Sequence, residues 1–196
     1  MEEYLARSAS GQSSRRPLVT LGRLLLKNRS HRGYDPRFIV REDQLRRIIG
    51  VNTRIPSARN RQVLRFRPVL AEIRLGGALP ELHLPLPGTE PNAFIIVCST
   101  VPEDRYVDID LGISVQSMLL QAAEIGLNGI CIGAFDKERI RQKFHLESEP
   151  LLIMAIGKGI EKIELVEISE NDDRRYFRKN GIHYVPKVRV EDLIIK

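Results

Sequence analysis

The sequence lacks several features that define common protein classes. It contains no tryptophan, only two cysteines, and no apolar run near the roughly 20 residues that a membrane-spanning helix needs. Its first residues are acidic and are not followed by an apolar core and a small-residue cleavage site, so they do not resemble a secretory signal. We therefore expect a cytoplasmic protein without a membrane partner.

Several motifs of well-known enzyme classes are also missing. The sequence has no Walker loop, no GxGxxG and no GxSxG, and the GKG at 157–159 predicts only a turn. The four histidines have no ligand spacing among themselves or with the cysteines, so we expect no metal. Cys98 and Cys131 each lie in an apolar run, which predicts reduced, buried thiols. No nucleophile with a nearby base stands out, and any chemistry is expected to belong to a cofactor.

Positive charge is concentrated in the first part of the chain. Residues 1–75 hold 17 Lys or Arg against 6 Asp or Glu, whereas the remainder holds 14 against 19. Such a region attracts anions, including nucleic acid, acidic membranes and phosphorylated cofactors. A basic nucleic-acid-binding module is therefore one alternative. The aromatic residues available there for base stacking are sparse, namely Tyr34, Phe38 and Phe66, so we expect no nucleic-acid partner.

The densest basic cluster is the segment NRSHRGYD at 28–35, which follows a leucine-rich helical pattern. Arg29 and Arg32 offer planar forks of donors that suit phosphate oxygens, and Ser30 adds a hydroxyl donor. A solvated helix end explains the same cations, because the helix dipole favours positive charge there. The residues alone leave both interpretations open.

The rest of the chain predicts alternating strands and helices in one domain over 17–196, after a disordered tail at 1–16. We expect an early helix from Pro17, a strand closed by Pro68, a long connection over 75–92, and a helix over 109–125 capped by Asp108 or Asp110. Further helices are expected at 42–51 and 137–144, strands at 93–101, 129–135, 151–157 and 163–168, and an Asn180-Gly181 hairpin. This pattern predicts an α/β or α+β fold, and the apolar C-terminal tail suggests a partner subunit.

Four segments in this order resemble the FMN-dependent nitroreductase family. They are LLKNRSHRGYD, PSARNRQVLRF, the long helix and glycine-bearing strand DLGISVQSMLLQAAEIGLNGICIGAFD, and PKVR near the C-terminus. The resemblance implies an α+β fold with a central, mainly antiparallel sheet flanked by helices. It also implies a homodimer that exchanges its C-terminal tails and binds FMN at the subunit interface.

The resemblance also assigns roles to individual residues. It implies that Arg29, Ser30 and Arg32 hold the FMN phosphate and ribityl chain and that Lys187 and Arg189 complete the phosphate site. The ring or ribityl groups would meet Ser57, Asn60 and Gln62, and the flavin N5 edge would approach the backbone at Gly133. Phosphate gathers cations, and a glycine lets a ring approach the backbone closely. Solvent exposure or helix capping also explains Asn60 and Lys187.

The implied activity is hydride transfer from NADH or NADPH to FMN, followed by transfer to a small-molecule acceptor such as a nitroaromatic or a quinone. The sequence departs from the family pattern at Val63-Leu64, where Pro-Trp is common. The short segment 67–92 also leaves no room for a large helical lid. A flavin-binding protein with specialised turnover or none therefore remains an alternative.

Overall fold

The computed structural model of the chain describes residues 20–70 and 88–195. The predicted tail at 1–16, the start of the first helix at Pro17 and most of the connection at 75–92 lie outside these residues. Among the described helices, none is both long and apolar enough to cross a membrane.

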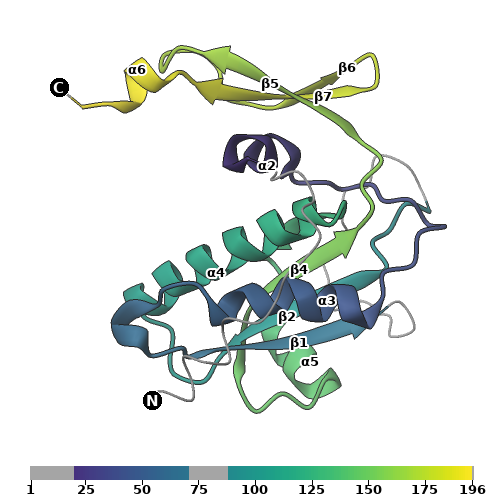
Figure 1. Ribbon diagram of the computed structural model, residues 1–196, viewed down its shortest axis with the longest axis vertical. Coiled ribbons are helices and arrows are strands. Elements are labelled where there is room, and N and C mark those ends of the chain that lie inside the picture. Colours follow the sequence, from purple (N-terminus) through teal and green to yellow (C-terminus); the bar gives the residue numbers. More distant parts are fainter. Residues whose placement is uncertain (1–19, 71–87, 196) are drawn as a thin grey trace, which may run out of the picture.

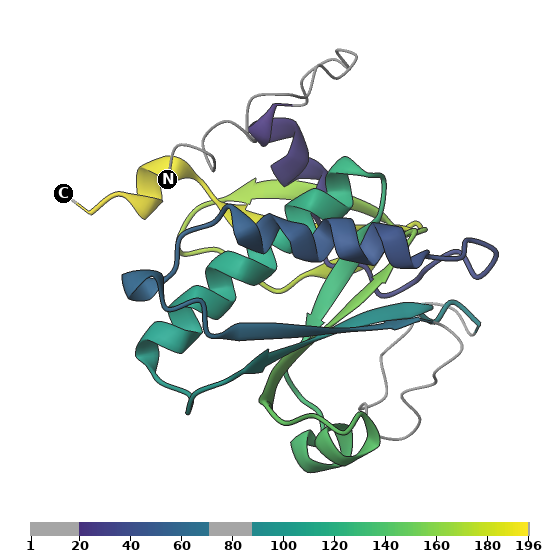
Figure 2. The same cartoon turned by 60° about the horizontal axis from the view of Figure 1, so that its bottom comes forward.

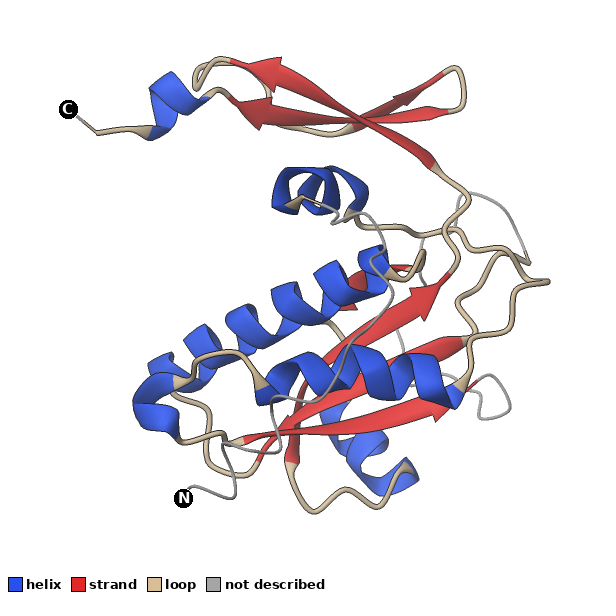
Figure 3. Cartoon of the chain, viewed as in Figure 1, coloured by secondary structure: helices blue, strands red, loops and turns tan. Residues whose placement is uncertain are grey.

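The described part of the chain is built on a four-stranded antiparallel sheet (Figures 1 and 3). Its strand order is β1-β2-β4-β3, and every neighbouring pair is antiparallel. All residues of β2 are buried, which confirms that this unbroken apolar run forms a central strand covered on both faces. The strands span Leu64–Leu70 (β1), Ala93–Ser99 (β2), Asn128–Ile132 (β3) and Glu149–Gly157 (β4).

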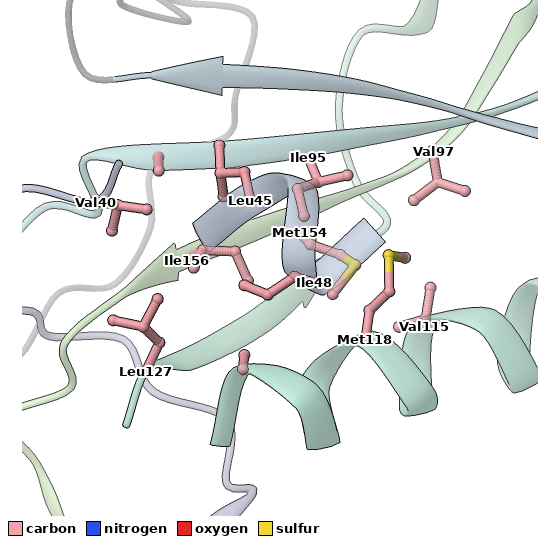
Figure 4. Close-up of a cluster of buried hydrophobic side chains, with 12 residues drawn as sticks. Val40, Leu45, Ile48, Ile95, Val97, Val115, Met118, Leu127, Met154 and Ile156 are labelled. Carbon is pink, nitrogen blue, oxygen red and sulfur yellow. The ribbon is translucent and has the colours of Figure 1, made fainter. Parts of the chain in front are cut away.

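Helices cover both faces of this sheet (Figure 2). The long α4 (Arg105–Glu124) and α3 (Glu42–Ile49) pack on one face, and α5 (Lys137–Lys143) packs on the other. Neighbouring residues of β2 point to opposite faces, so Ile95 belongs to the α3–α4 core and Ile96 to the α5 core. Figure 4 shows the larger core, which includes Leu45, Ile48, Ile95, Val97, Val115, Met118, Leu127, Met154 and Ile156.

Two expectations about strand residues are wrong because both lie on edge strands of the sheet. Pro68 does not close its strand but lies inside β1, paired with Ile95. A proline is tolerated on an edge strand, where its missing N–H need not bond a second neighbour. Cys131 is exposed on β3, the opposite edge, whereas Cys98 on the central β2 is buried as predicted.

The long helix begins four residues before its predicted start, and its cap is neither Asp108 nor Asp110. The Asp104 carboxylate accepts hydrogen bonds from the backbone N–H groups of Tyr106 (2.8 Å) and Val107 (2.7 Å). These donors have no partner inside the helix, so the carboxylate satisfies them and offsets the positive end of the dipole. Asp110 is instead a buried residue one turn further along.

Replacing this cap is expected to destabilise the fold measurably. Asp104→Ala should lower the free energy of unfolding by about 1 kcal/mol, the usual cost of losing an N-cap side chain. Asp108→Ala is the matched control, because that carboxylate lies in the same first turn but does not cap the helix, and it should cost only a few tenths of a kcal/mol. Urea unfolding would measure both values, and equal losses would contradict the assignment of the cap.

A smaller three-stranded sheet lies beyond the main one, with strand order β5-β7-β6. β5 (Lys162–Ile168) runs parallel to β7 (Ile182–Val188), and β6 (Phe177–Lys179) runs antiparallel to β7. Asn180 and Gly181 form the predicted two-residue turn, with φ of 52° and 75°. α2 (Leu21–Lys27) lies beside α4, below this sheet in the view of Figure 1, and α6 (Val190–Leu193) is the last helix of the described residues.

Candidate cofactor site

The basic segment at 28–35, here called the arginine loop, connects α2 to the edge of the main sheet. His31 donates its backbone N–H to the Gly129 carbonyl on β3 (3.2 Å), and Ser30 forms a parallel bridge with Gly129. Further along, the Tyr34 N–H bonds Thr89 O (2.9 Å) and the Asp35 N–H bonds Lys158 O (2.9 Å). The backbone of the loop is therefore fixed to the sheet rather than free in solvent.

Two glycines, one at the end of β4 and one just after it, make room for side chains of the arginine loop. A Cβ on Gly157 would lie 2.6 Å from Cδ1 of Tyr34, and one on Gly159 would lie 2.2 Å from Nδ1 of His31. The GKG segment is thus more than a turn, because both rings pack directly on its backbone. Tyr34 is 1% exposed and donates its hydroxyl to the His31 carbonyl (2.7 Å), so its ring is not available for base stacking.

The two arginines of the loop have different surroundings. Arg29 donates to the carbonyls of Asn28 (2.6 Å) and Leu25 (2.8 Å), so its guanidinium ties down the C-terminal end of α2, and burial lowers its pKa. The Arg32 guanidinium lies 5.3 Å from the ring centroid of Tyr176 and, within the described residues, forms no ion pair. Arg32 is therefore the cation of the loop that is better able to take up an anion.

A buried carboxylate that the sequence analysis did not single out lies under the loop. Glu161 accepts hydrogen bonds from the backbone N–H of Arg32, the backbone N–H of Gly33 (3.2 Å) and the Arg178 guanidinium (2.8 Å). Its side chain is 7% exposed, and burial by itself favours the neutral acid, but these hydrogen bonds outweigh burial and lower its pKa. Its position just before β5 carries no sequence motif that would have predicted this role.

A second predicted group, Ser57, Asn60 and Gln62, is brought together by its own hydrogen bonds. The Gln62 backbone N–H bonds Oγ of Ser57 (3.3 Å), and Nε2 of Gln62 bonds Oδ1 of Asn60 (3.0 Å). Arg59, Asn60 and Gln62 all have φ between 49° and 54°, in the left-handed region. Non-glycine residues rarely adopt this conformation, and such strained segments concentrate at functional sites.

This group borders a pocket of about 660 Å³ between β1, the loop after α3 and the start of α4. Ser57, Gln62 and Arg65 contribute polar groups to its lining, beside the apolar Phe66. Asp110 also lines the pocket; one of its oxygens accepts the Ala58 N–H (2.7 Å), and the other is buried without a partner. The pocket can thus receive a partly apolar ligand that carries a hydrogen-bond donor.

The two groups contact different turns of α4. Asn28 of the arginine loop bonds Gln116 (3.4 Å), whereas the Ser57 group is tied to Asp110 through Ala58. Six residues separate these two positions, which is about 9 Å along a helix axis. One chain therefore presents the two groups as separate surfaces along one helix.

The remaining predicted residues are more dispersed. Arg189 lies after β7 and pairs with Asp192 (2.9 Å), and Lys187 is exposed on β7. Within the described residues, no hydrogen bond or ion pair joins either of them to Arg29 or Arg32. Gly133 follows β3 directly, and a Cβ there would meet no atom within 4 Å, so packing within the chain does not require a glycine. In the described ranges, no cluster of His, Cys, Asp or Glu is arranged to hold a metal ion.

Part of the chain is similar in sequence to known proteins. Residues 81–158 match the model of the nitroreductase family. A protein of Methanocaldococcus jannaschii named as a nitroreductase is 37% identical over 57 residues, which are 29% of this chain and 29% of that protein. The matched segment therefore spans less than a third of this curated relative.

Solved structures share the fold over most of the chain. A nitroreductase family protein from Clostridium difficile 630 has a TM-score of 0.59 and 26% identity, covering 73% of this chain and 86% of its own. A nitroreductase family protein from Streptococcus pneumoniae TIGR4 has a TM-score of 0.60 and 17% identity, covering 74% and 93%. An FMN-dependent nitroreductase from Clostridium difficile R20291 has a TM-score of 0.56 and 20% identity, covering 71% and 87%. Residues 81–158 therefore resemble the nitroreductase family in sequence, and the chain shares its α+β fold with solved proteins of that family.

Proposed function

We propose that the protein is an FMN-dependent oxidoreductase that takes hydride from NADH or NADPH and passes it to a small-molecule acceptor. A nitroaromatic compound or a quinone is the class of acceptor that we propose. The observation that carries the proposal is the Arg32 guanidinium, held on an anchored loop without a carboxylate partner among the described residues. The family match and the FMN named for a solved relative support the same assignment.

The residues present fit a phosphorylated flavin. Arg32 and the exposed Ser30 offer donors for a phosphate, and Arg29 adds positive charge nearby. The open side of Gly133 leaves room for a flat ring against the backbone. The amide groups of Asn60 and Gln62 can pair with polar atoms at a ring edge.

FMN, when bound, supplies the hydride chemistry of the proposed reaction. The chain contributes binding and orientation: Arg32 and Ser30 fix the phosphate end, and the backbone at Gly133 faces the ring. Ser57, Asn60 and Gln62 bind polar groups at the far end of the ligand. Lys187 and Arg189 are proposed to complete the phosphate site.

A homodimer would bring the two separated groups into one site. α2 contains no buried residue, and its apolar side chains at Leu21, Leu25 and Leu26 are 62%, 41% and 64% exposed. The C-terminal Leu193 and Ile195 are 67% and 97% exposed as well. Apolar surface of this kind is stabilised by burial against a partner. We propose that a second copy covers it, places its own Ser57 group opposite the arginine loop and exchanges its C-terminal tail.

The absorbance spectrum of the purified protein tests the cofactor, and anaerobic addition of NADH or NADPH tests turnover. The proposal predicts a flavin band that bleaches when the nicotinamide is added and returns when a quinone or nitroaromatic is added. A purified protein that takes up no FMN would refute the proposal. A flavin that binds but is not reduced by either donor would favour a flavin-binding protein without this turnover.

The arginine loop itself gives a sharper prediction. Arg29→Ala combined with Arg32→Ala should weaken FMN binding by about 10- to 100-fold, because charge-assisted hydrogen bonds to phosphate are lost. The fold should remain, since neither side chain belongs to the apolar core. Arg37→Ala with Arg41→Ala is the matched control, because both of these arginines are exposed and pair with nearby aspartates. Full flavin occupancy in the first variant, measured by fluorescence titration, would contradict the assignment.

A further inference from the structure

The hairpin at 174–184 has no assigned purpose, yet it packs directly against the arginine loop. The ring of Tyr176 lies under the Arg32 guanidinium, with 5.3 Å between the guanidinium carbon and the ring centroid. Arg178, on β6 of the same hairpin, forms the ion pair with Glu161 (2.8 Å). Glu161 in turn accepts the backbone N–H groups of Arg32 and Gly33. Three side chains that are distant from the loop in sequence therefore converge on it.

The two arginines near Glu161 interact with it in different ways. Two arginines, Arg32 and Arg178, contact one buried carboxylate, and of these two only Arg178 forms an ion pair with it; Nδ1 of His183 also lies 3.8 Å from this carboxylate. Arg32 contributes its backbone N–H to Glu161, while its guanidinium rests on an aromatic face instead. A cation–π contact holds a guanidinium in place without neutralising it, so all of its charge remains available to another anion.

We infer that Glu161, Tyr176 and Arg178 form a clamp that keeps the Arg32 guanidinium free and aimed at a phosphate monoester. Glu161 orders the backbone of the loop, Arg178 neutralises Glu161, and Tyr176 supports Arg32. The inference deepens the proposed function and rests on it for the identity of the phosphate, which is that of FMN. These are positioning residues, because each of them acts through the arginine loop.

The charge balance explains why Arg178 is needed. A buried carboxylate without a cationic partner is costly, and it recruits any cation within reach. The backbone N–H of Arg32 is bonded to Glu161, so we expect its side chain to be able to turn toward the same carboxylate, as the Arg175 side chain does at Asp173. Without Arg178, we expect Glu161 to capture the Arg32 guanidinium and withdraw it from the phosphate. Arg178 thus strengthens phosphate binding without contacting the phosphate.

Two ligands that differ by one phosphate isolate this effect. Riboflavin has the ring and ribityl chain of FMN but no phosphate. The dissociation constant of riboflavin divided by that of FMN therefore reports the contribution of the phosphate alone. Arg178→Ala should lower this ratio about tenfold while leaving riboflavin binding unchanged. Glu161→Gln should lower it by a similar factor, because the loop loses the carboxylate that orders its backbone.

The double variant separates the clamp from simple structural damage. In Glu161→Gln with Arg178→Ala there is no carboxylate to capture Arg32, so FMN binding should be no weaker than in Glu161→Gln alone. Independent structural damage would instead make the two losses add and would weaken riboflavin binding too. Arg175→Ala is the matched control, because it lies on the same hairpin with a side chain that is 89% exposed, and it should change neither ligand.

A second readout tests the clamp without flavin. The NMR signal of the Arg32 Nε–H group, assigned by its loss in Arg32→Lys, should move to a carboxylate-bonded position in Arg178→Ala and stay unchanged in the double variant. An unchanged signal in Arg178→Ala would overturn the inference whether or not FMN binds. If the signal moves in Arg178→Ala but the wild-type protein binds FMN and riboflavin equally, the result would support the clamp and refute the proposed phosphate site.

Discussion

Replacing Gly129 with alanine is expected to lower the free energy of unfolding by about 3 kcal/mol, the upper end of the cost of overpacking a core. Gly129 lies on β3, where a Cβ would be 2.8 Å from the Ala155 carbonyl oxygen and 2.8 Å from Cδ2 of Leu119. Leu119 has a flexible side chain, but Ala155 is buried in β4 and pairs with strands on both sides, which holds its carbonyl in place. The strain must therefore displace β3 itself.

The same substitution should also disturb the arginine loop, because Gly129 is its anchor on the sheet. The Gly129 carbonyl accepts the His31 N–H, and Ser30 forms its bridge to this residue. A shift of β3 moves Ser30, so FMN binding in the variant should fall about tenfold or more, in addition to the loss of stability. Urea unfolding and fluorescence titration of FMN would measure the two effects separately.

Gly112→Ala provides the matched control. Gly112 lies within α4, and a Cβ there would meet no atom within 4 Å. Alanine in a helix interior is better than glycine by about 0.5–1 kcal/mol, so this variant should be slightly more stable than the wild type and bind FMN equally. A Gly129→Ala protein as stable as the Gly112→Ala protein would show that β3 can move away from β4 at little cost.

Much of the fold follows from local patterns in the sequence. The apolar runs that became β2 and β4 are long enough for strands and too uniform for an edge, so their central position could be predicted. The Asn180-Gly181 turn and α5 follow from turn chemistry and helical periodicity. The boundary of α4 was harder to place, because Asp104, Asp108 and Asp110 are equally good caps by residue type.

In the candidate site too, groups that are close in sequence could be predicted, whereas contacts between distant segments could not. Ser57, Asn60 and Gln62 are close in sequence, so a single loop brings together the residues that the resemblance groups, and their role at a ligand stays a prediction. Glu161 could not be found in this way, because its importance comes from meeting Arg32 and Arg178, which lie on other elements. Long-range meetings of charged groups leave no local periodicity, and one sequence without an alignment does not reveal them.

Two buried histidines near the clamp give the fold a pH dependence. His31 and His183 are 6% and 4% exposed, and the structure provides no hydrogen-bond partner for Nδ1 of His31 or for either ring nitrogen of His183. Burial lowers the pKa of both; the nearby Arg178 lowers that of His183 further, and Glu161 opposes the shift for both without reversing it. We therefore expect the folded protein to take up protons on both imidazoles less readily than the unfolded chain does.

The sign of the effect follows from proton binding. Below about pH 6.5, the ordinary histidine pKa, the unfolded chain binds more protons than the folded one, so the free energy of unfolding falls as the pH falls. Each histidine contributes at most about 1.4 kcal/mol per pH unit between its unfolded and folded pKa values. Glu161 acts in a lower window, because its pKa is lowered from 4.5 and its contribution is lost only in more acidic solution.

We therefore expect the stability of the protein to fall clearly between pH 7.5 and pH 5.5, as measured by urea unfolding at each pH. His31→Gln with His183→Gln should flatten this dependence, because neither site then takes up a proton on unfolding. His145→Asn is the control, since His145 is exposed and asparagine tolerates its left-handed φ of 49°, and it should leave the slope unchanged. If the double variant keeps the wild-type slope, these two histidines are not its source, and other groups must bind the protons on unfolding.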